Sequence, residues 1–145
     1  MVTKIALVSC VKKKQCTPMP ARYLYCSDWF RKASAYAMCI ADEWYILSAK
    51  YGLVEPDRVI APYDVTLNRM SAAERREWAR QVLSDLKKLL EPGDHAAILA
   101  GEKYRENLIK PIQDMDCNVE IPMQGLGFGR QKGWLKQRLS ECNHA

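Results

Sequence analysis

The chain has 145 residues, of which 48% are hydrophobic and 27% are charged, which is ordinary for a globular protein and enough to bury the core of one domain. It contains no apolar run of about 20 residues, which excludes a membrane-spanning helix and a membrane as partner. The formal net charge of +5 favours polyanions as partners. No repeat or linker divides the chain, so we predict a single domain over residues 1–145.

The first part of the chain predicts a buried strand followed by a helix and a second strand. Residues 4–9, KIALVS, are mostly aliphatic and end in a polar turn. No small-residue cleavage site follows them, so we expect a strand and not a signal peptide. Residues 27–41 begin with Ser27, a candidate N-cap, and continue as a predicted helix. A second strand is predicted for residues 43–48.

The second part of the chain continues the alternation of helices and strands. Ser71 and Glu74 form a capping box, which predicts the start of a helix over 71–90 that the sequence EPGD then ends. The remaining predicted elements are a strand at 95–100, a short helix at 101–112, a strand at 117–122 and a basic helix at 130–142.

This alternation predicts the fold class and the place of a binding site. Strands that alternate with helices pair in parallel through right-handed crossovers, and such sheets are covered on both faces. We therefore predict an α/β fold, a three-layer α/β/α sandwich with a mainly parallel sheet of about four strands. Ligands of such sheets bind beyond the carboxyl ends of the strands. The segments SCVKKK, SAKYGL, AGEKY and PMQGLGFG each follow a predicted strand, so we expect all four at one edge of the sheet.

The six cysteines are spread over predicted strands, helices and loops, at positions 10, 16, 26, 39, 117 and 142. None forms a C-x-x-C pair, and the hydrophobic share is high enough for a core without disulfides. We therefore expect reduced cysteines and a cytoplasmic location. The two histidines, His95 and His144, have no metal-ligand spacing, so we predict neither a metal site nor a cofactor.

The exit of the first strand carries candidate ligand-binding residues. Ser9, Cys10 and Lys12 could form a phosphate-binding turn, in which backbone N–H groups and a lysine hold an anion. The P-loop motif is absent. Lys12 also fits a solvated lysine run, together with Lys13 and Lys14. Cys10 also fits a small packed side chain, although neighbouring cations would make its thiol more reactive.

The exit of the second strand is the most informative stretch. Ser48, Lys50 and Tyr51 follow the strand, and Gly52 permits a backbone turn that other residues resist. Tyr51 can stack on a flat ring or form a hydrogen bond. It can equally pack on the core as part of a turn.

Two further segments supply candidate catalytic carboxylates. In APYDV, Tyr63 and Asp64 follow a proline, and Asp64 fits either a general base or the cap of a turn. In AGEKY, Gly101, Glu102 and Tyr104 lie at a helix start. Glu102 is the second candidate catalytic residue, and it also fits a first-turn acid that interacts with the helix dipole.

The segment LSAKYGLVEPDRVIAPYDVTL resembles the central part of the YaaA-like peroxide-stress proteins, which share a Ser-x-x-Tyr-Gly-Leu element followed by prolines that match Pro56 and Pro62. The segments LVSCVKK and ILAGEKYRENL are similar to two further elements of that family, Ser-x-x-Lys and Leu-Ala-x-x-x-Tyr. Short, mostly uncharacterised bacterial and phage domains resemble the chain more closely.

The resemblance implies DNA binding through a cleft lined by basic residues and a role in the stress response to oxidative damage. A more distant likeness connects the chain to the uracil-DNA-glycosylase-like domains of archaeal tRNA-modification enzymes. That likeness implies that a base is handled in the pocket.

Three functions fit these residues. In the first, an enzyme holds an extruded base between Tyr51 and Tyr63, Lys12 and Lys50 face phosphate, and one of the candidate carboxylates orients a water. In the second, nucleic acid is bound without chemistry, and the basic helix at 130–142 contacts its backbone. In the third, the pocket takes a free nucleotide or small anion.

Glycosylase-like chemistry ranks ahead of pure binding on these residues. We expect nucleic acid, DNA rather than RNA, or a nucleotide as the partner. Nothing in the sequence sets the oligomeric state.

Overall fold

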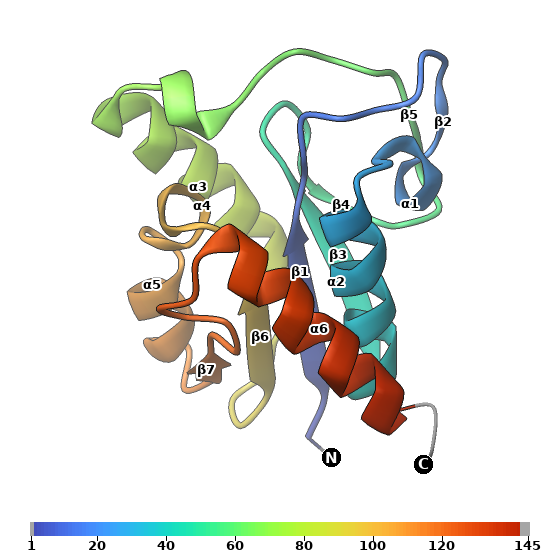
Figure 1. Cartoon of the computed structure of the whole chain (residues 1–145). Coiled ribbons are helices and arrows are strands. Elements are labelled where there is room, and N and C mark those ends of the chain that lie inside the picture. The colour runs from blue at the N-terminus through green and yellow to red at the C-terminus, as the bar shows by residue number, and fades with distance from the viewer. Residues whose placement is uncertain (1, 143–145) are drawn as a thin grey trace.

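The structure is a computed structural model that describes residues 2–142 (Figure 1). Five strands form its main sheet: β1 (Lys4–Ser9), β3 (Glu43–Ser48), β4 (Gly52–Val54), β6 (His95–Leu99) and β7 (Asn118–Glu120). Their order is β4-β3-β1-β6-β7, and every neighbouring pair is parallel except β3 with β4. The strands β2 (Met19–Pro20) and β5 (Val59–Ile60) form a small antiparallel sheet. The predicted α/β fold with a mainly parallel sheet is confirmed.

The helices cover the two faces of the main sheet. They are α1 (Ala21–Leu24), α2 (Asp28–Ile40), α3 (Ala72–Leu86), α4 (Glu102–Arg105), α5 (Ile109–Gln113) and α6 (Phe128–Cys142), with a 3₁₀ turn, η1 (Leu67–Arg69). The chain crosses from β1 to β3 through α2 and then returns past β1 to β6 through α3. Right-handed crossovers in opposite directions place α2 and α3 on opposite faces. Accordingly, α6 packs beside α2, and α4 and α5 lie next to α3.

The centre of the sheet is β1, because its neighbours β3 and β6 pair with it on both sides. Its residues Ile5–Val8 are at most 1% exposed. The strand order reverses at β1, since the chain leaves it toward β3 on one side and returns to β6 on the other. In open parallel sheets, such a reversal leaves a crevice beyond the carboxyl ends of the two adjacent strands where it occurs, here β1 and β6. The fold therefore prepares a site beyond β1 and β6.

Three local predictions differ from the structure. Residues 52–54 form a fifth strand that turns back along β3, and Gly52 makes this turn with a φ of +73°. The predicted helix at 101–112 is the two helices α4 and α5. A continuous helix would require an N–H at Pro111, whereas a proline in the first turn of α5 needs none. The last helix begins at Phe128, two residues before its predicted start.

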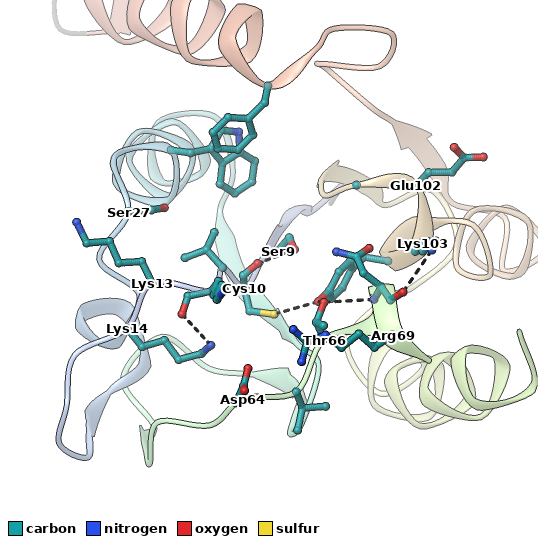
Figure 2. Close-up of a pocket in the computed structure, with 18 of the residues that line it drawn as sticks. Ser9, Cys10, Lys13, Lys14, Ser27, Asp64, Thr66, Arg69, Glu102 and Lys103 are labelled. Carbon is teal, nitrogen blue, oxygen red and sulfur yellow. Dashed lines mark hydrogen bonds between the residues drawn. The ribbon is translucent and has the colours of Figure 1, made fainter. Parts of the chain in front are cut away.

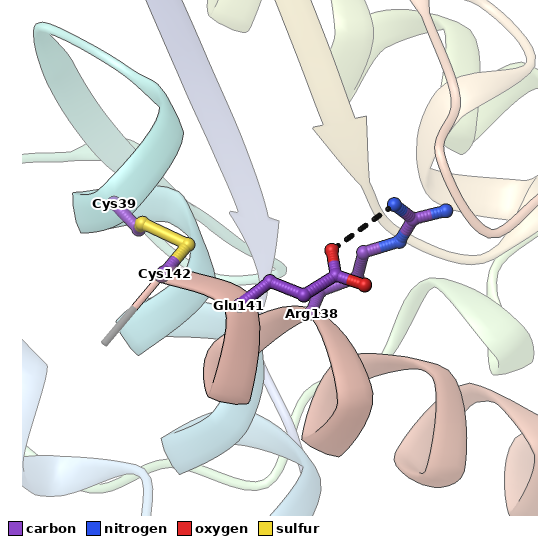
Figure 3. The surroundings of a disulfide bond; sticks show 4 residues. All are labelled: Cys39, Arg138, Glu141 and Cys142. Atoms are coloured by element: carbon purple, nitrogen blue, oxygen red, sulfur yellow. Dashed lines mark hydrogen bonds and ion pairs between the residues drawn. A yellow bond between two sulfur atoms is a disulfide. The ribbon is translucent and has the colours of Figure 1, made fainter. Parts of the chain in front are cut away.

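The prediction that the cysteines are reduced is wrong for one pair. Cys39 of α2 and Cys142 of α6 form a disulfide, beside an ion pair between Arg138 and Glu141 (Figure 3). The two cysteines are 103 residues apart in the sequence, so only the packing of α6 against α2 brings them together.

None of the helices within residues 2–142 is long and apolar enough to cross a membrane.

The disulfide predicts a redox-dependent stability. Because the bond closes a loop of 103 residues, Cys142→Ser should lower the free energy of unfolding by about 2–4 kcal/mol. Urea denaturation measures this change, and a reductant should lower the wild-type midpoint to that of the variant. Cys16→Ser removes an exposed free thiol and should leave both the midpoint and its response to reductant unchanged. An equal wild-type midpoint with and without reductant would contradict the prediction.

Candidate functional site

A cavity of about 840 Å³ opens beyond the carboxyl ends of β1 and β6, where the strand order reverses (Figure 2). This volume is within the range of small-molecule sites in proteins. Ser9 and Cys10 from the exit of β1 and Tyr104 from α4 form its floor, at 7%, 9% and 8% exposure. The walls come from the lysine loop after β1, the start of α2, residues 64–69 and the start of α6. Five separate segments of the chain thus enclose one space.

Residues 64–69, which we call the rim segment, are anchored by tyrosine hydroxyls at two points, Tyr63 just before the segment and Leu67 within it. Before the segment, the Tyr63 hydroxyl accepts a hydrogen bond from Ser48 Oγ at 2.8 Å and shares one with the Tyr25 hydroxyl at 2.6 Å. Within it, the backbone N–H of Leu67 donates to the Tyr104 hydroxyl at 3.3 Å. These bonds hold an irregular stretch of chain in place along one side of the cavity.

Burial keeps these hydroxyls protonated. It raises the pKa of Tyr104 to about 12 and also raises the pKa of Tyr63 and of Tyr25. A neutral hydroxyl can donate one hydrogen bond and accept others. The tyrosines therefore act at neutral pH as hydrogen-bonding anchors and not as charged groups.

Two aromatic residues, Trp29 and Phe128, form another wall of the cavity, which we call the aromatic wall. The rings of Trp29 in α2 and Phe128 in α6 are stacked, with centroids 6.4 Å apart and planes inclined by 22°. Trp29 is 5% exposed, whereas Phe128 is 61% exposed at the mouth. The Nε1–H of Trp29 donates to Oε1 of Gln131 at 2.9 Å, which locks the indole to α6. An exposed ring on a fixed support can stack on a flat ligand.

The charges around the cavity favour an anion. Five cationic side chains line it against the two carboxylates Asp64 and Glu102. The cations are Lys12, Lys13, Lys14, Arg69 and Lys103.

Lys14 is the half-buried member of this group. Its Nζ lies 4.4 Å from the centre of the Tyr63 ring and donates to the Lys12 carbonyl at 3.3 Å. Burial lowers the pKa of Lys14. A nearby anion would stabilise the charged form of this ammonium group.

The structure brings together seven of the twelve residues that the sequence predicts for the site. Those that line the cavity are Ser9, Cys10, Lys12, Asp64, Gly101, Glu102 and Tyr104. Those that do not line it are Ser48, Lys50, Tyr51, Gly52 and Tyr63. The exits of β1 and β6 thus meet at the cavity, whereas the exit of β3 folds back into β4.

The residues outside the cavity support it from behind. Ser48 is fully buried and accepts a hydrogen bond from the Tyr51 N–H at 3.0 Å. The Tyr51 ring meets the Tyr63 ring edge to face, with centroids 5.7 Å apart, and Lys50 lies over the Tyr51 ring. Because the two rings are in contact with each other, a base cannot stack between them. The prediction that a base stacks between Tyr51 and Tyr63 is therefore wrong.

Several lining residues were not predicted from the sequence. They are Trp29, Asn68, Arg69, Lys103, Phe128 and Gln131. The signal for Phe128 is its place in a glycine-rich loop that follows the last strand, where an aromatic residue has no core to join. Within residues 2–142, no three His, Cys, Asp or Glu side chains are grouped closely enough to hold a metal ion.

The known proteins to which the chain is similar have no established function. The model of a "Family of unknown function (DUF6884)" matches residues 5–137, a range that includes every residue lining the cavity. The "Uncharacterized protein YfjM" of Bacillus subtilis (strain 168) is 33% identical over 141 residues, covering 86% of this chain and 89% of that protein. No solved structure matches the chain significantly. The expected likeness to short uncharacterised bacterial domains is confirmed. The likeness to phage domains, to YaaA-like proteins and to uracil-DNA-glycosylase-like domains stays a prediction.

The anchoring role of Tyr104 can be tested by removing its hydroxyl. Tyr104→Phe leaves the buried N–H of Leu67 without its acceptor, which should lower the free energy of unfolding by about 1–3 kcal/mol. Urea denaturation measures this loss. The matched control is Tyr36→Phe, since the Tyr36 hydroxyl makes no hydrogen bond within residues 2–142, and its effect should stay below about 0.5 kcal/mol. Equal stabilities of the two variants would argue against the anchor.

Proposed function

The chain belongs to the family of unknown function DUF6884, and we propose that it binds nucleic acid, takes one base into the cavity and acts on it as a glycosylase-like hydrolase. The observation that carries the proposal is the stacked pair Trp29 and Phe128, which share one cavity with five cationic side chains. Proteins hold exposed bases by stacking on aromatic rings while basic groups track the phosphates. The pocket offers both kinds of contact.

The cavity floor suits a base better than a phosphate. Ser9, Cys10 and Tyr104 are buried and offer hydroxyl and thiol groups, whereas the ammonium and guanidinium groups of Lys12, Lys13 and Arg69 are on exposed residues. A base placed on the floor would offer its edge to hydroxyl and thiol groups and its face to the aromatic pair. The phosphates of the same nucleotide would stay at the charged mouth.

The hydrolytic step is assigned to Asp64. Figure 2 shows Asp64 below Lys14, facing the open cavity, whereas the carboxylate of Glu102 points outward on the other side. Asp64 would take a proton from a water whose oxygen forms a bond to C1′ of the sugar. The bond from C1′ to the base breaks at the same time, and the base leaves with the bonding electrons and takes up a proton. Glu102 remains the second carboxylate to test.

The resemblance to YaaA-like proteins extends this proposal to DNA in preference to RNA and to a role in the stress response. A cytoplasmic location is part of the same proposal. Glutathione and thioredoxin keep cytosolic thiols reduced, so there the bond between Cys39 and Cys142 would form under oxidising stress.

The aromatic wall predicts the first binding result. Phe128→Ala should weaken binding of single-stranded DNA roughly 5- to 150-fold, since stacking of one base is worth about 1–3 kcal/mol. Fluorescence anisotropy with a labelled oligonucleotide measures the dissociation constant. Tyr23→Ala is the matched control, because Tyr23 is similarly exposed, at 64% against 61%, but does not line the cavity. Equal affinity of wild type and Phe128→Ala would refute the base pocket.

Variants of the two carboxylates, Asp64 and Glu102, can distinguish a hydrolase from a protein that only binds nucleic acid. If the protein is a hydrolase, Asp64→Asn should bind DNA as wild type does or more tightly, since a carboxylate near phosphates is lost, while releasing no base. Chromatography of free bases after incubation with damaged and undamaged single-stranded DNA measures the product, with Glu102→Gln as a parallel variant. If wild type binds DNA but releases no base from any substrate tested, the protein is a non-catalytic nucleic-acid-binding module.

A further inference from the structure

We infer that the cavity takes a nucleotide from within a single strand of nucleic acid, with one neighbouring phosphate held on each of two opposite sides of its mouth. This inference rests on the proposed function and names the substrate class of that site. It selects an internal nucleotide of a strand over a free nucleotide and over a base within a duplex. Three features carry it: the floor without Lys, Arg, Asp or Glu, the charges on both sides of the mouth and the exposed ring of Phe128.

The charge around the cavity is arranged by depth. Ser9, Cys10, Trp29 and Tyr104 are the deep residues, at 5–9% exposure, and no Lys, Arg, Asp or Glu is among them. Lys12, Lys13, Arg69 and Lys103 are exposed residues of the mouth. A phosphate on the floor would lose its hydration without meeting a cation, which is unfavourable. The neutral part of a ligand therefore belongs on the floor and its anionic parts at the mouth.

The cations stand on opposite sides of the mouth. One set, which we call the lysine side, is Lys12, Lys13 and Lys14 from the loop after β1. The other, the arginine side, is Arg69 at the end of η1 and Lys103 in α4. Figure 2 shows Lys13 and Lys14 on one side, Arg69 and Lys103 on the other, and Ser9 and Cys10 between them.

This arrangement fits a strand better than a free nucleotide. The phosphates of a free nucleoside phosphate form one chain on one side of the sugar, so they would engage one set of cations and leave the other unused. A nucleotide within a strand carries one phosphate toward each neighbour. Figure 2 shows Asp64 between Lys14 and Arg69, and Glu102 next to Lys103. These two carboxylates would repel further phosphates at those places, which restricts the path of the nucleic-acid backbone.

The depth of the site excludes a base that remains stacked in a duplex. The deep residues lie below a charged mouth, and a paired base cannot reach them without leaving its stack. Phe128 stands at the mouth with Lys132 Nζ 5.6 Å from its ring centre. An aromatic ring beside a cation is the pairing that single strands use for stacking and phosphate contact. The ligand is therefore a single strand, or a strand with one base extruded.

Oligonucleotides with one uncharged linkage test this inference directly. The probes are DNA strands with one central base, each of the four in turn, and abasic sugars elsewhere, so that only one base can enter the pocket. A methylphosphonate replaces the phosphate on the 5′ side, on the 3′ side or on neither. The proteins are wild type, Lys12→Ala with Lys13→Ala, and Arg69→Ala with Lys103→Ala. Lys87→Ala with Lys88→Ala, an exposed pair that does not line the cavity, is the control.

Each methylphosphonate should weaken wild-type binding by roughly two- to five-fold, as expected for an exposed ion pair. The lysine-side variant should become insensitive to one of the two replacements and remain sensitive to the other. The arginine-side variant should show the opposite pattern, and the control pair should behave as wild type. Nucleoside monophosphates with the same base should bind at least ten-fold more weakly than the unmodified strand.

The outcomes separate this inference from the proposed function. If both variants respond to both replacements as wild type does, or if a mononucleotide binds as tightly as the strand, the two-sided contact is wrong. In that case, weaker binding by Phe128→Ala still supports a base pocket for a free nucleotide. If Phe128→Ala binds every probe as wild type does, the proposed function itself fails.

Discussion

The hydroxyl groups of Tyr63 and Tyr104 hold the rim segment against the end of the sheet, and the shape of the cavity depends on this attachment. The segment contains no strand, and its regular part is the short turn η1. Tyr63 reaches back to Ser48 at the end of β3, and Tyr104 reaches Leu67 from α4. Buried hydroxyls are costly unless they are paired. Because the Tyr63 hydroxyl is paired with those of Ser48 and Tyr25, and the Tyr104 hydroxyl with a backbone N–H, the network can fix one position for residues that would otherwise form a loose loop.

The order of the strands determines where the cavity opens, and the helices supply its walls. The reversal at β1 opens a crevice, but two helices must return to that edge before the crevice has walls. α2, which follows β1, β2 and α1 in the chain, brings Trp29, and α6 comes last and brings Phe128. The hydrogen bond from Trp29 to Gln131 connects the two helices at the cavity. The aromatic wall of the cavity thus results from the packing of the first long helix against the last.

The sequence predicted the parts of this structure that repeat over many residues. β1, β3 and β6 are long and buried, so their aliphatic runs were clear, and the strand-exit rule placed Cys10 and Tyr104 near one another. It failed for Ser48 to Gly52 because a three-residue strand, β4, leaves no periodic pattern and turns that exit away. The aromatic wall and the disulfide depend on how α6 packs against α2. This packing is a long-range contact that local sequence patterns do not predict. Polar residues predicted to bind a ligand, such as Ser48 and Tyr63, instead serve the network that supports the rim.

The disulfide and the cavity involve opposite ends of α6. This separation decides whether the pocket depends on the disulfide. Cys142 is the last residue of the helix and Phe128 is the first, so the bond lies at the end farthest from the cavity. Between them, Leu135 is fully buried and Trp134 meets Tyr36 edge to face, with ring centroids 5.1 Å apart. These contacts, with the bond from Trp29 to Gln131, hold the half of the helix nearer the cavity without help from the disulfide. Reduction therefore removes stability from the whole fold while leaving the aromatic wall its own attachments, so the pocket does not require an oxidising compartment.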